Sequence, residues 1–163
     1  VDAHVVGKAL GFSLVGIGGN DIVDGNKKLL LALVWQMMRL HTLKFLAQVQ
    51  AKKFGGKEVD EQMIVEWANA LVESKGRSTR MQSFKDPTLR NGIFFMDLLF
   101  SVEPRVINWD FVTAGETQED AMNNAKYALS VARKLGATIF CLPEDIVDVK
   151  PKMILTFGTF VHL

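Results

Sequence analysis

The sequence has little of what disulfide-rich, membrane-spanning or nucleic-acid-binding proteins need. Cys141 is the only cysteine among 163 residues, so no disulfide forms within the chain, which is typical of a reducing compartment. The longest uninterrupted apolar run extends only from Leu29 to Trp35, far short of the roughly 20 residues that cross a bilayer. The 19 Lys and Arg residues nearly balance the 18 Asp and Glu residues, so the positive excess of nucleic-acid and membrane-surface binders is missing. We therefore expect a cytoplasmic protein whose partners are neither nucleic acids nor membranes.

Patterns that indicate catalysis, cofactors or metal binding are also missing from the sequence. Three histidines are scattered without partners at metal-ligand spacing, namely His4, His41 and His162. The glycine-rich stretch 16–20 has Asp21 where a dinucleotide-binding fingerprint needs its third glycine, so a tight turn explains the stretch better. Cys141 lies in an apolar stretch, where a buried thiol is inert. We expect no catalytic residue, no metal site and no cofactor.

What the chain does have is helical periodicity. No long stretch alternates apolar and polar residues with a period of two, so the predicted fold class is all-α. The predicted helices are a short segment ending at Gly11, residues 27–50, 59–74, 87–103 and 117–136, a short turn from Pro143 and a last helix from Pro151. Asp86 before Pro87, and Thr117 with Asp120, have the positions of helix caps.

The predicted helix over residues 27–50 has two unusual features. Apolar residues cover most of its circumference, a pattern typical of a helix that is buried. Lys28, Gln36 and Arg39 share a narrow polar stripe at spacings that a helix aligns. Trp35 lies on the apolar part of this helix, and Trp67 lies on the apolar stripe of the next one. Both tryptophans are predicted to anchor a core, because tryptophan buries a large area.

Two parts of the sequence resemble each other. Residues 5–14 align with residues 130–139, and the tetrapeptide at 21–24 recurs at 145–148. The two alignments differ in offset by one residue, which predicts two copies of one helical unit. The first copy begins where the second is already mostly complete. We therefore expect the end of one domain over residues 1–50, a Gly- and Lys-containing linker over 51–58, and a whole domain over 59–163.

Five motifs carry a family resemblance. In order, they resemble the signature segments of a calponin-homology domain: residues 64–69, 92–99, 123–128, 142–146 and 150–155. More narrowly, residues 11–21 and 83–86 resemble the second actin-binding half of the fimbrins, also called plastins. The resemblance covers nearly the whole chain, and implies that residues 1–50 end a third calponin-homology domain and residues 59–163 form the fourth.

The resemblance also implies a function. In fimbrins each pair of calponin-homology domains binds filamentous actin, and two pairs in one chain cross-link filaments. The implied partners are therefore filamentous actin and the remainder of the chain's own tandem domain pair, in the actin cytoskeleton. Because most of the leading domain is absent, the apolar residues 29–46 are expected to be covered by missing protein, a second copy or the fourth domain.

Two surfaces are candidates for binding actin. By resemblance, the last helix of a leading domain contributes to the actin face, which selects Lys28, Gln36 and Arg39, with Lys27 and Lys44 as weaker candidates. The second surface is the basic loop over residues 76–85, with Arg77, Arg80 and Lys85, because a positive patch would steer the chain toward acidic filaments. Ordinary solvated surface explains the same loop. The predicted structural core residues are Trp35, Trp67, Leu98, Pro143 and Asp145, whereas the partner of Asp97 is not assignable from sequence.

Two other functions stay open. The chain could be an adaptor or regulatory module that binds another protein or packs internally. It could also be an α-helical enzyme, which a deep polar pocket with perturbed titratable groups would indicate.

Overall fold

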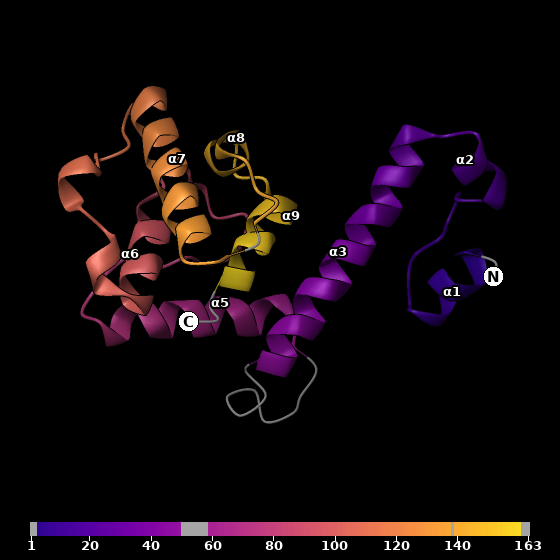
Figure 1. Cartoon of the computed structure of the whole chain (residues 1–163), viewed down its shortest axis with the longest axis horizontal. Helices are drawn as coiled ribbons and strands as arrows, with labels where there is room; N and C mark the ends of the chain where they lie inside the picture. The colour runs from indigo at the N-terminus through magenta and orange to yellow at the C-terminus, as the bar shows by residue number, and fades with distance from the viewer. Residues whose placement is uncertain (1–2, 50–58, 138, 161–163) are drawn as a thin grey trace. The chain divides into compact units, whose positions relative to one another are not determined.

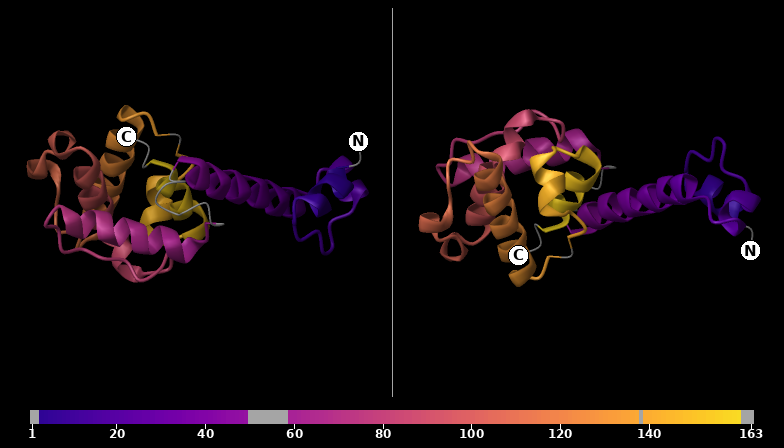
Figure 2. Two further views of the ribbon diagram at one scale, coloured as in Figure 1. Left: turned by 90° about the horizontal axis from the view of Figure 1, so that it is seen from below. Right: turned by 90° about the horizontal axis from the view of Figure 1, so that it is seen from above.

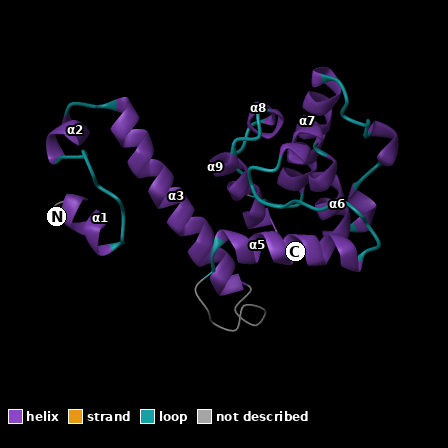
Figure 3. Ribbon diagram, turned by 180° about the vertical axis from the view of Figure 1, so that it is seen from behind, coloured by secondary structure: helices purple, strands orange, loops and turns teal. Residues whose placement is uncertain are grey.

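The computed structural model describes residues 3–49, 59–137 and 139–160, and every regular element in these ranges is helical (Figure 1). This confirms the all-α prediction, and Figure 3 shows helices joined by loops throughout the described part. The chain divides into two compact units, Val1–His41 and Thr42–Leu163. The predicted linker over residues 51–58 lies outside the described residues.

The first unit contains α1 (Ala3–Ala9), α2 (Gly19–Val23) and the larger part of α3 (Lys27–Val49), which continues into the second unit. The chain turns after α1 at Gly11, whose φ of +76° lies in the left-handed region that glycine adopts without strain. The glycine-rich stretch before α2 forms a turn, with Gly16 at a φ of +72°. The turn predicted over residues 16–20 is confirmed only before Gly19, where α2 already begins.

The second unit is a bundle of helices around one core (Figure 2). Its elements are α5 (Glu61–Ser74), η1 (Pro87–Asn91), α6 (Ile93–Val102), η2 (Pro104–Val106), η3 (Trp109–Phe111), α7 (Gln118–Lys134), α8 (Pro143–Val147), α9 (Pro151–Ile154) and η4 (Leu155–Phe160). At its centre the rings of Phe95 and Phe157 lie 4.7 Å apart, measured between centroids. Leu99 and Leu129 are fully enclosed, so α6, α7 and η4 share one apolar interior.

The predicted core residues are not all equally buried. Leu98 and Asp145 are buried. Trp67 is half-buried and lines a small apolar cavity together with Phe94, and Trp35 and Pro143 are also half-buried. The tryptophans therefore lie at the edges of the packed regions and not at their centres, as a large amphipathic ring often does.

Helix starts follow the predicted caps, but one helix is divided. The Asp86 Oδ1 atom accepts the N–H of Thr88 at 2.9 Å, and the Thr117 Oγ1 atom accepts the N–H of Asp120 at 3.0 Å. The single helix predicted over residues 87–103 is wrong, because η1 ends and α6 begins at Gly92, which has a φ of +77°. A Cβ atom at Gly92 would lie 2.9 Å from the Cβ atom of Asn124, so close packing against α7 requires glycine there.

The internal repeat is visible in the hydrogen bonds of both units. The Oδ2 atom of Asp21 accepts the N–H of Gly18 at 2.8 Å, and that of Asp145 accepts the N–H of Leu142 at 2.9 Å. The residue five positions after each aspartate donates its backbone N–H to the carbonyl of that aspartate, at 2.9 and 2.8 Å. The two copies therefore fold alike around equivalent aspartates.

Candidate functional site

Four of the five candidates on α3 are cations, and the fifth, Gln36, is hydrogen-bonded to Ser13 within the first unit. Lys27 and Lys28 are exposed in the first unit, Arg39 is half-buried there, and Lys44 is exposed on the part of α3 that belongs to the second unit. We call Lys27, Lys28 and Arg39 the α3 basic stripe. Lys44 lies about 160° around the helix from Lys28 and is a separate candidate. Lys28 and Arg39 lie about three helical turns apart, which places them on one face of α3.

Both polar groups of the Gln36 side chain are hydrogen-bonded within the first unit. Its Nε2 atom donates to the carbonyl of Ser13 at 2.9 Å, and its Oε1 atom accepts the N–H of Ser13 at 2.6 Å. Both ends of the amide therefore fasten the loop around Ser13 onto α3. That Gln36 contacts actin stays a prediction, and the structure shows that its hydrogen-bonding groups already serve the fold of the first unit.

The Arg77 side chain pairs with a buried carboxylate of the second unit. Its Nε atom donates to Oδ1 of Asp97 at 2.5 Å, while the Thr79 hydroxyl donates to Oδ2 at 2.6 Å. The Asp97 side chain is only 2% exposed, and the Arg77 guanidinium carbon lies 4.1 Å from the centroid of the Trp109 ring. This network gives Asp97 its partner. That Arg77 contacts actin stays a prediction, and its guanidinium is already paired with Asp97.

The outward-facing cations of the basic loop are Arg80 and Lys85. Arg80 lies 3.3 Å from the carboxylate of Glu73 on α5, and both side chains are largely exposed, so this ion pair adds little stability. Lys85 is exposed. The loop thus presents a smaller positive surface than its sequence indicates.

The basic loop is held in place by buried polar side chains. Asn69 on α5 donates to the carbonyl of Met81 at 2.8 Å and accepts the N–H of Met81 at 2.9 Å. The Oδ2 atom of Asp86 accepts the N–H of Gln82 at 2.7 Å. Burial raises the pKa of Asp86, but hydrogen bonds from the Thr88 hydroxyl and from the backbone of Gln82 and Thr88 outweigh it, so the pKa lies below its usual value. Asp86 is therefore a charged anchor of the loop.

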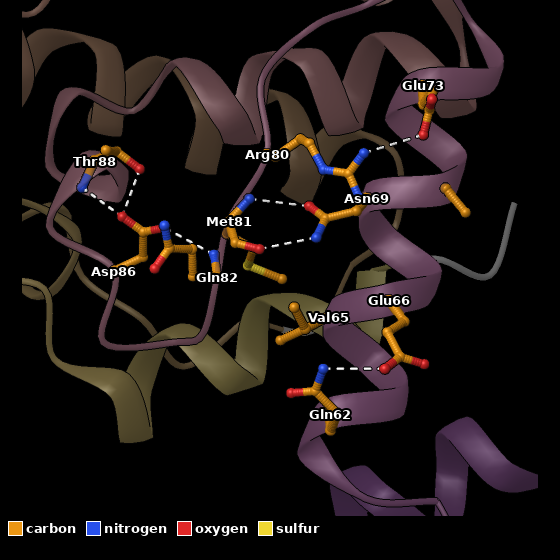
Figure 4. A pocket seen from close by; sticks show the side chains of 11 residues that line it. Gln62, Val65, Glu66, Asn69, Glu73, Arg80, Met81, Gln82, Asp86 and Thr88 are labelled. Carbon is orange, nitrogen blue, oxygen red and sulfur yellow. Dashed lines mark hydrogen bonds and ion pairs between the residues drawn. The ribbon is translucent and has the colours of Figure 1, made fainter.

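A groove of about 550 Å³ runs between α5 and residues 80–88 (Figure 4). Val65 and Met81 form part of its floor, and Glu66, Glu73 and Arg80 lie along its rim. The sequence analysis did not predict this groove, because its two walls come from segments that only the fold brings together.

Asn124 is another polar residue that the sequence analysis missed. It is fully buried on α7, and its Nδ2 atom donates to the carbonyls of Asn91 and Thr113 at 2.8 and 2.9 Å. Its Oδ1 atom accepts the N–H of Thr113 at 3.0 Å. One side chain therefore joins η1 and the segment before α7 to the core.

The described residues offer few groups suited to chemistry. Burial raises the pKa of the Cys141 thiol to about 12, which leaves it protonated and unreactive at neutral pH. Within residues 3–49, 59–137 and 139–160, no group of three His, Cys, Asp or Glu side chains could hold a metal ion. None of the helices in this part of the chain is long and apolar enough to span a membrane.

The fold and the motifs match a known family. Residues 58–163 match the calponin homology (CH) domain. The chain belongs to the calponin homology family. Its relatives include Fimbrin-2 of Arabidopsis thaliana, which is 54% identical over 93% of this chain and 23% of the relative. Human Plastin-3 is 48% identical over 89% of this chain and 22% of its own length. The predicted resemblance to fimbrins and plastins is thereby confirmed.

A solved structure is similar over almost the entire chain. The actin-crosslinking core of Schizosaccharomyces pombe fimbrin matches 99% of this chain and 33% of that structure, with a TM-score of 0.82 and 42% sequence identity. This chain spans less than a quarter of the length of Fimbrin-2 and Plastin-3.

Proposed function

We propose that this calponin-homology chain binds filamentous actin as part of a cytoplasmic cross-linking, or bundling, protein of the actin cytoskeleton. The proposal includes no catalysis and no cofactor. The observation that carries it is the similarity of nearly the whole chain to the actin-crosslinking core of a fimbrin.

The α3 basic stripe is the proposed contact surface. Lys27 and Lys28 are exposed, and Arg39 shares a face of α3 with Lys28. Lys44 is also exposed and is a weaker, separate candidate. Clustered positive charge steers a protein toward an acidic filament and increases the association rate. Arg80 and Lys85 form the second proposed surface, because both are exposed cations of the basic loop. Hydrogen bonds with Asn69 and Asp86 hold this loop in place.

Co-sedimentation of the tandem domain pair with actin filaments tests this proposal. We expect the pair to sediment with filaments, and the bound fraction to fall as salt rises from about 50 to about 300 mM, because salt screens exposed charges. A folded pair that stays in the supernatant at saturating filament concentration would contradict the proposal and favour the adaptor function.

We also propose that the remainder of a leading calponin-homology domain covers the apolar face of the first unit. The internal repeat supports this, because equivalent residues differ sharply in exposure. Leu31 is 68% exposed whereas its counterpart Leu155 is 1% exposed, and Val23 is 84% exposed whereas Val147 is 5% exposed. In the second unit, α6 supplies Phe95 as the partner of η4. Helices equivalent to α5 and α6 would enclose α3 in the same way.

A further inference from the structure

The groove between α5 and residues 80–88 differs in charge from the α3 basic stripe, and shares only Arg80 with the second proposed actin surface. Glu66, Glu73 and Asp86 line it, and Arg80 is the only cation among its lining residues (Figure 4). Three carboxylates against one guanidinium leave an excess of negative charge. This charge favours a basic ligand over an acidic one.

The floor of the groove narrows the class of ligand. Val65 and Met81 are buried beneath it, and Ala70 adds a methyl group from α5. A cavity with an apolar floor and a carboxylate rim matches a long basic side chain, which buries its aliphatic stem while its charged end stays among polar groups. A small inorganic cation would gain nothing from contact with the apolar floor of the groove.

The three carboxylates that line the groove differ in what they already bind. Asp86 already accepts hydrogen bonds from Gln82 and Thr88 on its two oxygens, and Glu73 is paired with Arg80. Glu66 accepts a single side-chain hydrogen bond, from Gln62 at 3.0 Å, although a carboxylate offers about four acceptor sites. Because Glu73 already faces the Arg80 guanidinium and Glu66 faces a neutral amide, Glu66 is the carboxylate at which a new cation would bind.

The groove exists before any ligand arrives. Asn69 holds both backbone groups of Met81, and Asp86 fixes the backbone of Gln82 and Thr88. Because the wall opposite α5 is already ordered, a ligand loses less free energy to ordering the protein.

We propose that this groove binds an arginine or lysine side chain presented by an extended segment of a partner protein. The stem lies against Val65 and Met81, and the charged end donates to Glu66. This interaction goes beyond actin binding, because its partner is basic and its surface lies apart from the α3 basic stripe in sequence and in charge.

Fluorescence anisotropy with a labelled peptide, Gly-Arg-Gly-Arg-Gly, tests the proposal on the tandem domain pair. We expect saturable binding that weakens about threefold in Glu66→Gln, as for one exposed charge pair. The matched control is Glu119→Gln, which makes the same change at an exposed position of α7 and should leave the affinity unchanged. A peptide with citrulline in place of arginine keeps the shape without the charge and should not bind.

Three results would overturn the proposal. They are absence of saturable binding, equal binding of the citrulline peptide, and equal effects of the Glu66→Gln and Glu119→Gln changes. Actin co-sedimentation of Glu66→Gln separates this site from the actin surface, because we expect it to match the unmodified pair. A lost actin interaction would show that the groove is part of the filament contact and would contradict a separate basic partner.

Discussion

The Asp97 carboxylate is stable in the interior because Arg77 and Thr79 both donate to it. Replacing Asp97 with Asn removes the negative charge and leaves the Arg77 guanidinium without its counter-charge. We expect the free energy of unfolding to fall by about 2 kcal/mol, less than for a fully enclosed pair because Arg77 is 34% exposed. Urea denaturation measures this. Glu73→Gln, which breaks the exposed pair with Arg80, should change stability by less than about 0.5 kcal/mol, and equal losses in the two variants would contradict the interior role of Asp97.

Position 115 requires glycine for two reasons, namely its backbone conformation and the atoms that surround it. Its φ is +71°, and a Cβ atom there would lie 2.8 Å from the carbonyl oxygen of Asn91. Gly115→Ala should therefore destabilise the second unit by more than about 2 kcal/mol. Gly76 is a matched control, since its φ of +73° is similar but a Cβ atom there would have no neighbour within 4 Å. Gly76→Ala should cost only about 1 kcal/mol, and a thermal or urea unfolding comparison that ranks the two equally would contradict the close packing.

Among the helices, the start of η1 depends on the ionisation of Asp86. Its folded-state pKa lies below the usual value, so the stability that it contributes is present above the unfolded pKa of about 4 and is lost as pH falls through the folded pKa. In Asp86→Asn, the loss of unfolding free energy relative to the original chain should therefore be largest near neutral pH and shrink in acid. Urea denaturation at a series of pH values measures this, and a loss that does not change with pH would contradict a charged cap.

Local chemistry made several helices predictable from the sequence. Asp86 and Thr117 cap the elements that follow them, because a cap requires only a side-chain oxygen within two or three residues of a free N–H group. The internal repeat was predictable for a similar reason, since the aspartates at positions 21 and 145 close short loops with their own neighbours. The break at Gly92 was not, because it depends on Asn124 in α7.

The candidate site was predictable from the sequence only in part, because local spacing can be read from a sequence and long-range contacts cannot. Exposed lysines on α3 follow from helical spacing, which is a local property. Gln36 and Arg77 are also polar and lie in the predicted surfaces, but their partners are 23 and 20 residues away along the chain. Composition and periodicity do not report such contacts.

At the level of the whole chain, the first unit exposes several large apolar side chains. Leu31, Val34 and Met37 are exposed on α3, and recur every three residues, so they form a contiguous apolar strip. We expect the 163-residue chain alone to self-associate at micromolar concentration and to bind a hydrophobic dye. Sedimentation equilibrium measures the association. A stable monomer that binds no dye would contradict the proposed covering of this face by a leading domain.

The most direct test of the actin-binding account is charge reversal on the α3 basic stripe. In the tandem pair, Lys28→Glu with Arg39→Glu should weaken actin co-sedimentation by about tenfold or more, because two attractive contacts become repulsive. Circular dichroism checks that the variant is folded. Lys8→Glu with Lys126→Glu makes the same change in charge at other exposed positions and should bind nearly as well as the original pair. Unchanged co-sedimentation of the Lys28 and Arg39 variant, or an equal loss in the control, would contradict α3 as the actin contact.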